Sequence, residues 1–188
     1  GISVEIVKLV GYSQDRIDRI YYGALLHDIG KISIPIEILE YPGRLSYQAM
    51  NIMRTHVEIT EEILCGIVAE DICKLAVRHH ECPDGSGYPR GLSGESLTEE
   101  QRIIAVADVL SALRGKRSYK DTFSKEKIMD IIKEMGESGK LCDKITTVVL
   151  SHYDEIMAGA DKQCEALLAT YTHVTDEFEA LYQKLKEI

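Results

Sequence analysis

Apolar residues recur at helical spacing along almost the whole chain, and this spacing restricts the fold more than any other feature. The first example is the segment from Ile2 to Val10, whose apolar side chains share one helical face before Gly11. Almost nothing alternates with the period of two that a half-buried strand requires. We therefore predict an all-α fold, with one compact helical domain over residues 1–149 and a helical extension over residues 150–188.

Capping and breaking residues indicate where the expected helices begin and end. Ser13 and Ser124 can cap helices, and residues 98–101 form a capping box. Gly30 and Pro35 end the second helix. The expected helices cover residues 2–10, 14–29, about 46–64, about 69–80, 99 onward through Asp108, and 125 to about 136. The expected loops are residues 36–45, which hold a Pro-Gly turn, and the long polar segment 81–97.

The C-terminal extension carries an apolar seam at heptad spacing. The seam consists of Leu150, Tyr153, Met157, Ala160, Cys164, Leu167, Tyr171, Val174, Phe178, Leu181, Leu185 and Ile188. Two interpretations fit this pattern. The extension could be a long helix that lies on its own domain, or it could form a coiled-coil or helix-pair contact between two copies. Our hypothesis is that it mediates a homodimer, although Cys164 and Ala160 make the seam a poor zipper.

The charge balance excludes one broad class of partner. The formal net charge is −9, and an acidic surface repels the phosphate backbones of DNA and RNA. We expect no nucleic-acid binding of that kind. A small anionic substrate remains compatible with the charge, because bound metal ions and a few local cations can reverse the field inside a pocket.

The cysteines and the apolar runs indicate a cytoplasmic location. The five cysteines are odd in number and form no Cys-x-x-Cys pair, which indicates reduced thiols. They are Cys65, Cys73, Cys82, Cys142 and Cys164. The longest apolar runs are too short to span a bilayer, and no signal-peptide pattern opens the chain. Because the chain begins with Gly1, we expect the natural start to lie upstream.

Histidines and aspartates form the chemically most informative pattern of the chain. The candidate metal ligands are His27, Asp28, His56, His79, His80 and Asp108. Imidazole nitrogens and carboxylate oxygens without matching cysteine pairs suit divalent iron, manganese or zinc. His152 and His173 have no such neighbours in a motif, and we expect them to be structural or exposed.

The pairing of these residues fits a site with two metal ions. A carboxylate such as that of Asp28 has two oxygens, so it can bridge two ions about 3.5–4 Å apart. His79 and His80 would point about 100° apart on a helix. They can therefore reach one ion only at a helix terminus, or else they serve two ions. Lys31 follows Asp28 by one turn and offers a compact cation beside the metals.

The motifs resemble those of the HD-GYP domains, which are bacterial phosphodiesterases of cyclic di-GMP. The resemblance covers residues 20–119 and depends on HDIGK at 27–31, on His56, on HHECPDGSGYP at 79–89 and on Asp108. It implies that the six candidate ligands hold two divalent metal ions, often iron or manganese, with zinc, nickel or magnesium as alternatives. It also implies catalytic roles for Asp28 and Lys31.

The same resemblance implies a reaction and partners. The metal pair would activate water for hydrolysis of cyclic di-GMP to pGpG or GMP, and Lys31, Arg117 and Lys120 would contact substrate phosphates. The loop after His80 is expected to shape the site and to recognise GGDEF-type diguanylate cyclases. Its shaping residues are Asp84, Gly85, Gly87, Tyr88 and Pro89, with both glycines expected to permit positive φ.

Three departures from the family pattern leave alternatives open. The family usually supplies a further histidine from a helix before HDIGK, but residues 1–26 contain none, and its usual place falls before Gly1. Cys82 replaces a common arginine, and Ser111 and Ser118 replace an acid and a proline. The alternatives are a catalytically impaired module that binds nucleotide or protein partners, and an HD phosphohydrolase acting on another cyclic or linear nucleotide.

Overall fold

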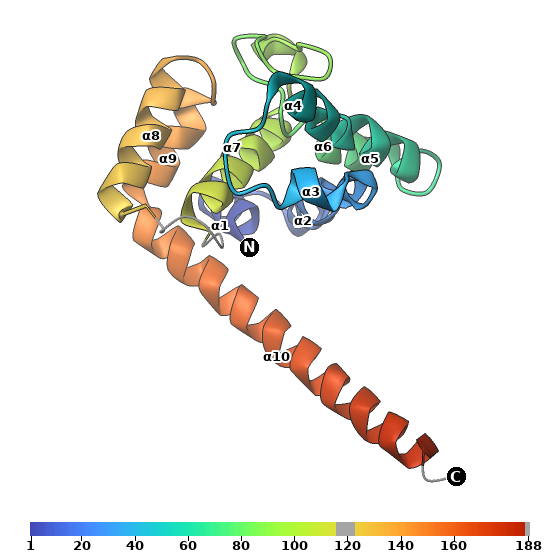
Figure 1. Ribbon diagram of the computed structural model, residues 1–188. Coiled ribbons are helices and arrows are strands. Elements are labelled where there is room, and N and C mark those ends of the chain that lie inside the picture. The colour runs from blue at the N-terminus through green and yellow to red at the C-terminus, as the bar shows by residue number, and fades with distance from the viewer. Residues whose placement is uncertain (116–122, 187–188) are drawn as a thin grey trace.

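The computed structural model describes residues 1–115 and 123–186, and helices joined by loops make up this part of the chain (Figure 1). The helices are α1 (Ile2–Val10), α2 (Gln14–Leu26), α3 (Ile36–Leu39), α4 (Tyr47–Arg54), α5 (His56–Leu64), α6 (Glu70–Ala76), α7 (Glu99–Arg114), α8 (Lys125–Glu137), α9 (Asp143–Ser151) and α10 (Tyr153–Lys186), with 3-10 turns η1 (Ile29–Ser33) and η2 (Gly94–Ser96). Within the described ranges the only β pairing is an isolated bridge between Asp84 and Ser93. The predicted all-α fold is confirmed.

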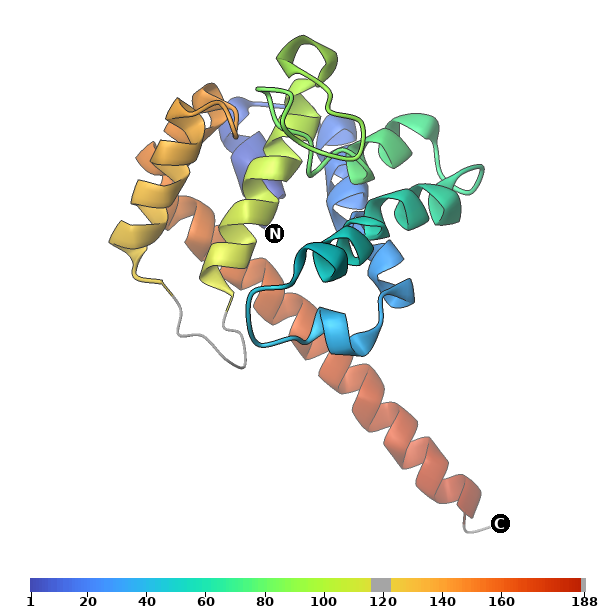
Figure 2. The same cartoon turned by 45° about the horizontal axis from the view of Figure 1, so that its top comes forward.

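Helix α7 runs through the middle of the domain, with α2 and α6 on one side and α8 and α9 on the other (Figure 2), and it also packs against α1. It buries apolar side chains around most of its circumference, including Ile103, Ile104, Val106 and Leu110. Each such side chain contributes roughly 1.5–3 kcal/mol by leaving water. Asp108 lies on this same helix, so the packing that forms the core also fixes the position of a candidate ligand.

The expected single helix over residues 46–64 is wrong, because the chain breaks between α4 and α5 at Thr55. The Thr55 hydroxyl donates a hydrogen bond to the carbonyl of Ile52 at 2.7 Å. A threonine that bonds its own backbone in this way competes with the helical pattern. The break makes His56 the first residue of α5, where its side chain faces the turn of the chain around Asp28.

Two other expected segments also differ from the structure. The helix that begins near residue 70 ends at Ala76, so His79 and His80 lie in the turn that follows it and not on the helix. The segment 36–45 contains the short helix α3 directly after Pro35. Among the predicted caps, Thr98 and Ser124 accept hydrogen bonds from Gln101 N and Lys127 N. Ser13 occupies its cap position without a side-chain cap bond.

Helix α10 begins inside the core and then leaves the domain as a single projecting rod (Figure 1). Tyr153, Ile156, Met157 and Ala160 are buried against the domain. The described apolar side chains from Leu167 onward are exposed. None of the described helices has a stretch long and apolar enough to cross a bilayer. The boundary between a domain over residues 1–149 and an extension over residues 150–188 stays a prediction.

Gly30 sets how closely η1 approaches α5, and its replacement by alanine is expected to destabilise the fold. A Cβ atom there would lie 2.1 Å from the His56 carbonyl oxygen and 2.7 Å from Thr60 N. Gly30→Ala would push η1 away from α5 at a cost of about 1–3 kcal/mol. Urea unfolding measures this loss. Gly94→Ala is the matched control, because its Cβ would meet nothing closer than 3.4 Å. Equal unfolding midpoints for the two variants would contradict the prediction.

Candidate metal centre

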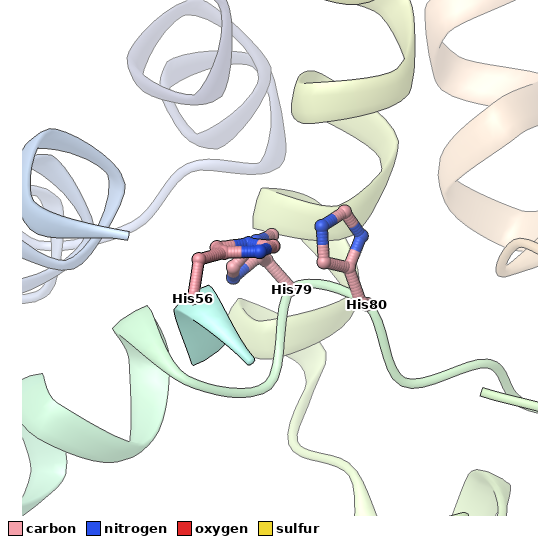
Figure 3. A group of neighbouring side chains, drawn as sticks. All are labelled: His56, His79 and His80. Carbon is pink, nitrogen blue, oxygen red and sulfur yellow. The ribbon is translucent and has the colours of Figure 1, made fainter. Parts of the chain in front are cut away.

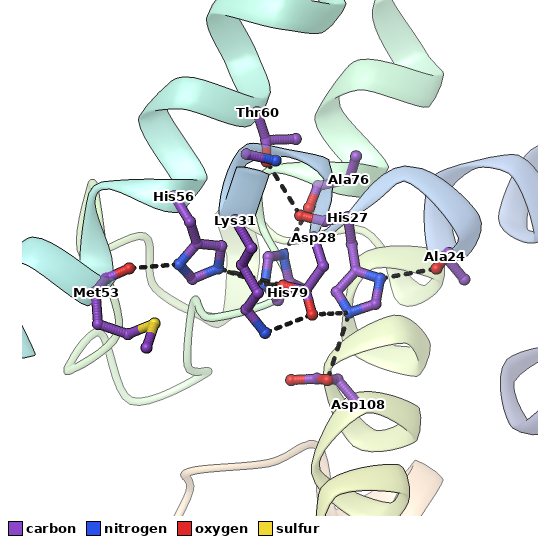
Figure 4. Close-up of polar contacts among 11 residues, drawn as sticks. Ala24, His27, Asp28, Lys31, Met53, His56, Thr60, Ala76, His79 and Asp108 are labelled. Carbon is purple, nitrogen blue, oxygen red and sulfur yellow. Dashed lines mark hydrogen bonds and ion pairs between the residues drawn. The ribbon is translucent and has the colours of Figure 1, made fainter. Parts of the chain in front are cut away.

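The six predicted ligands come from four separate segments and meet in one centre. Figure 4 shows five of them around the carboxylate of Asp28, and the sixth, His80, lies beside His56 and His79 (Figure 3). His27 and Asp28 lie between α2 and η1, and His56 opens α5. His79 and His80 follow α6, and Asp108 comes from the middle of α7. Sequence positions as far apart as 27 and 108 are thus brought together by the packing of α2, α5 and α6 near α7.

Each oxygen of Asp28 faces its own set of imidazole nitrogens. Asp28 Oδ1 lies 3.4 Å from His56 Nε2 and 3.9 Å from His79 Nε2. Asp28 Oδ2 lies 3.3 Å from His27 Nε2, which in turn is 3.5 Å from Asp108 Oδ1. This arrangement agrees with the prediction that Asp28 serves two sides of one centre.

Three of the histidines are oriented by the same backbone contact. The Nδ1 atoms of His27, His56 and His79 each donate a hydrogen bond to the carbonyl three residues earlier, at 2.7, 2.7 and 2.6 Å. The acceptors are the carbonyls of Ala24, Met53 and Ala76. A bond at Nδ1 fixes the ring and directs Nε2 into the centre, as ligand histidines require.

The surroundings of Asp28 Oδ1 give the best test of whether these residues fit a cation. This oxygen is buried and has no hydrogen-bond partner in the described part of the chain. A buried unpaired acceptor costs about 1–3 kcal/mol, and more when it is charged. A divalent ion would satisfy this oxygen and the nearby imidazole nitrogens together, and this mixture of nitrogen and oxygen donors suits borderline metals.

The donor atoms form two overlapping groups of three. The first is His27, Asp28 and His79, and the second is His56, His79 and His80, with the ligand atoms of each group within 4.8 Å of one another. In Figure 3 the imidazoles of the second group converge on one space, and His79 and His80 lie with ring centroids 4.0 Å apart. His79 belongs to both groups, so the residues present fit a metal centre with more than one position.

Burial and the carboxylates drive the histidine pKa values apart. Burial lowers the pKa of His79 and His56, and it lowers the pKa of His80 to about 4. Burial also acts to lower the pKa of His27, but Asp108 and Asp28 outweigh it and raise that pKa to about 10. Without a metal, the raised pKa keeps the His27 ring protonated at neutral pH. A cation that binds its Nε2 would displace the proton on that nitrogen.

Lys31 lies where the sequence predicts it, beside the candidate ligands. Its Nζ is 2.5 Å from Asp28 Oδ2. Burial acts to raise the pKa of Asp28, but His27 and Lys31 outweigh it and lower that pKa below its usual range. Asp28 is thus ionised and ready to bind a cation. The other predicted phosphate contacts, Arg117 and Lys120, lie outside the described residues.

Arg54 is a candidate functional residue that the sequence reasoning missed. Its guanidinium lies 4.9 Å from the centroid of the Tyr88 ring, and Tyr88 stacks on His80 with centroids 4.6 Å apart. Of the described acidic side chains, none forms an ion pair with Arg54. The sequence offered one signal for this role, which is the position of Arg54 two residues before His56. The helix break at Thr55 lies between the two residues, and Arg54 lies beside Tyr88.

The loop after His80 is held by a buried glutamate that the sequence reasoning also missed. Glu81 is 2% exposed, and its carboxylate accepts hydrogen bonds from Arg90 N and Leu92 N, both at 2.8 Å. Gly85 has a φ of 77°, as predicted. The prediction for Gly87 is wrong, because its φ is not positive. Gly87 is required by close approach instead, since a Cβ there would lie 2.4 Å from Cys82 N.

An all-helical domain that gathers histidines and a second aspartate around one half-buried carboxylate has the features of a metal-centre protein. The comparison with known families agrees with this class. Residues 2–144 match the family described as HD domain. The chain belongs to the HD domain family.

Curated relatives and solved structures narrow the position within this family. The chain is 40% identical over 157 residues to the 3'3'-cGAMP-specific phosphodiesterase 2 of Vibrio cholerae, covering 81% of this chain and 30% of that protein. It is 40% identical over 141 residues to the cyclic di-GMP phosphodiesterase response regulator RpfG of Xanthomonas campestris, covering 73% and 37%. The chain thus spans about a third of the length of these relatives.

The fold also matches a solved structure. Bd1817, named as an HDG"Y"P protein from Bdellovibrio bacteriovorus, superimposes with a TM-score of 0.66 at 15% identity, covering 81% of this chain and 49% of that one. At this identity the match supports the fold alone. Together with the relatives, it confirms the resemblance to HD-GYP domains that the sequence motifs indicate.

Metal binding is expected to release about one proton per chain near neutral pH, because His27 is protonated in the metal-free protein while His79 and His80 are neutral. The affinity should then rise about tenfold per pH unit below the pKa of His27. Calorimetric titration with Mn²⁺ in buffers of different ionisation enthalpy counts the protons. His27→Gln is the control and should release about one proton fewer. Equal release by both proteins would contradict the assignment.

Proposed function

We propose that this chain hydrolyses a phosphodiester bond of a cyclic dinucleotide in a metal-dependent reaction, converting cyclic di-GMP to pGpG or GMP. The observation that carries the proposal is the convergence of three oriented imidazoles on the carboxylate of Asp28, whose buried Oδ1 has no hydrogen-bond partner among the described residues. The curated relatives named above act, by their names, on cyclic di-GMP or 3'3'-cGAMP. They support the substrate class.

Two divalent ions, iron or manganese, would be held by the six residues around Asp28. The proposed ligands are His27, Asp28, His56, His79, His80 and Asp108. When bound, such ions supply Lewis-acid charge for the scissile phosphate and lower the pKa of water for attack. The histidine Nδ1 contacts to backbone carbonyls hold the ligand geometry before any ion arrives, which reduces the reorganisation that binding requires.

Lys31 and Arg54 would supply the protein's own positive charge to the substrate. Lys31 Nζ contacts Asp28 and would neutralise charge on the phosphate that reacts. Arg54 is exposed beside Tyr88, 4.9 Å from the ring centroid, and forms no ion pair with the acidic side chains of the described residues. A planar guanidinium can hold a second phosphate by two parallel hydrogen bonds. Arg117 and Lys120 remain predicted phosphate contacts.

The main test is hydrolysis by protein purified without oxygen and loaded with iron or manganese. Chromatography should detect pGpG or GMP from cyclic di-GMP, with 3'3'-cGAMP tested in parallel as the competing substrate. His79→Gln and Asp28→Asn should each lower the rate by about 100-fold or more, because each removes a group shared by the proposed metal positions.

His152→Gln is the matched control for these variants. His152 is exposed and pairs with Glu155 away from the centre, so its loss should leave the rate unchanged. Binding of cyclic di-GMP without any linear product would replace the proposal by a module that binds nucleotide. Turnover of 3'3'-cGAMP alone would retain the reaction and change the substrate.

Arg54→Gln is expected to raise KM for the cyclic dinucleotide about tenfold or more, the effect of losing a charged hydrogen bond to phosphate. Hydrolysis of bis(p-nitrophenyl) phosphate, which has one phosphate, should change little. Arg16→Gln is the control, because Arg16 also stacks on a tyrosine, Tyr12 at 3.6 Å, but pairs with Glu100 on another face. A similar loss on both substrates would assign Arg54 a structural role.

Recognition of a GGDEF-type diguanylate cyclase by the loop stays a prediction. The loop presents Ser86, Pro89 and Arg90 at its surface, while Glu81 and Gly87 hold it against the centre. Any protein that contacts this exposed segment would therefore lie close to Tyr88 and His80.

A further inference from the structure

We propose that the projecting part of α10 pairs with the same segment of a second copy of this chain, in antiparallel orientation. Six apolar side chains on this segment are about half exposed or more. They are Leu167 (61%), Leu168 (59%), Tyr171 (71%), Val174 (58%), Phe178 (66%) and Tyr182 (49%). An exposed apolar stripe of this length on one helix marks an interaction surface.

The same seam of α10 has two different environments. Tyr153, Met157 and Ala160 belong to it and are buried against the domain. From Leu167 onward its described members are exposed, with Leu167 at 61% and Phe178 at 66%. The domain therefore occupies the first part of this face and leaves the second part free for a partner.

The free face approaches the size of a stable interface. Its six side chains would remove at most roughly 700 Å² per chain from water, since a buried aromatic side chain contributes about 150–250 Å². Stable interfaces bury about 800 Å² per partner. Leu168 and Tyr182 lie beside the heptad seam and widen the stripe, as on a helix that packs in a bundle.

The threonine hydroxyls of this segment need no partner outside the helix. The hydroxyls of Thr170, Thr172 and Thr175 donate to carbonyls one turn earlier in the same helix, at 3.1, 3.0 and 2.9 Å. Most of the stability of a helix in a protein comes from packing of its apolar face. A second apolar helix is thus the occupant that fits, and another copy supplies one with matching spacing.

The position of the domain favours the antiparallel orientation. In a parallel pair, both domains would lie at the same end and would occupy the seam face where the other helix must pass. In an antiparallel pair, the domains lie at opposite ends, so only the last turns of each helix approach the other domain. Seam residues then meet in complementary layers, with Leu167 opposite Phe178 of the second copy and Tyr171 opposite Val174 of the second copy.

Light scattering over a range of concentrations tests the pairing. We expect the mass of two chains for the unmodified protein and of one chain for Leu167→Glu/Phe178→Glu. Ala169→Glu/Gln183→Glu, which adds two charges away from the seam, should remain dimeric. Both variants should keep the melting temperature of the domain, because these positions are exposed. A monomeric unmodified protein, or a dimer that survives Leu167→Glu/Phe178→Glu, would overturn the proposal.

Disulfide trapping in a Cys65→Ser background tests the orientation. In the antiparallel pair the two Cys164 residues lie about 26 Å apart along the helices, and a disulfide requires Cα atoms within about 7 Å. We expect no crosslink from Cys164 or from Leu167→Cys alone. Leu167→Cys/Phe178→Cys should form crosslinked dimers on mild oxidation. A crosslink through Cys164 or through Leu167→Cys alone would show a parallel pair and overturn the orientation.

Discussion

The carboxylate of Asp28 is the constraint on which the rest of the structure depends. A buried carboxylate with one unpartnered oxygen is expensive unless cations or hydrogen-bond donors compensate for it. Here Lys31 pairs with the other oxygen, and the imidazoles of His27, His56 and His79 surround the group. The protein alone leaves Oδ1 unsatisfied. A bound cation, as we propose for this site, would satisfy this oxygen.

Three of the candidate ligands, His27, His56 and His79, lie at helix ends, and this placement explains their common orientation. His27 follows α2, His56 begins α5 after the break at Thr55, and His79 follows α6. At such positions a carbonyl three residues earlier is free to accept from the ring Nδ1. A histidine in the middle of a long helix would find that carbonyl bonded to a backbone N–H. The chain breaks that sequence reasoning missed are thus the features that let histidines become ligands.

Spacing and residue type predicted the all-α fold and the six residues that meet, because both depend on local periodicity and on the chemistry of the motifs. The break at Thr55, the role of Arg54 and the reason for Gly87 could not be predicted in the same way. Each depends on a contact with a distant segment, such as Arg54 on Tyr88 or Gly87 on Cys82. A glycine needed for close approach and one needed for positive φ look the same in a sequence.

The proposed dimer and the metal centre are physically connected at the base of the projecting helix. A pocket of about 360 Å³ is lined by His27 and Asp108 on one side and by Cys164 and Leu167 of α10 on the other. In the antiparallel pair, Phe178 of the second copy packs on Leu167 and therefore lies at the edge of this pocket. Pairing of two chains would narrow the space beside the ligands His27 and Asp108. Assembly would then change access to the centre without moving any ligand, because the helix that lines the pocket is also the helix that pairs.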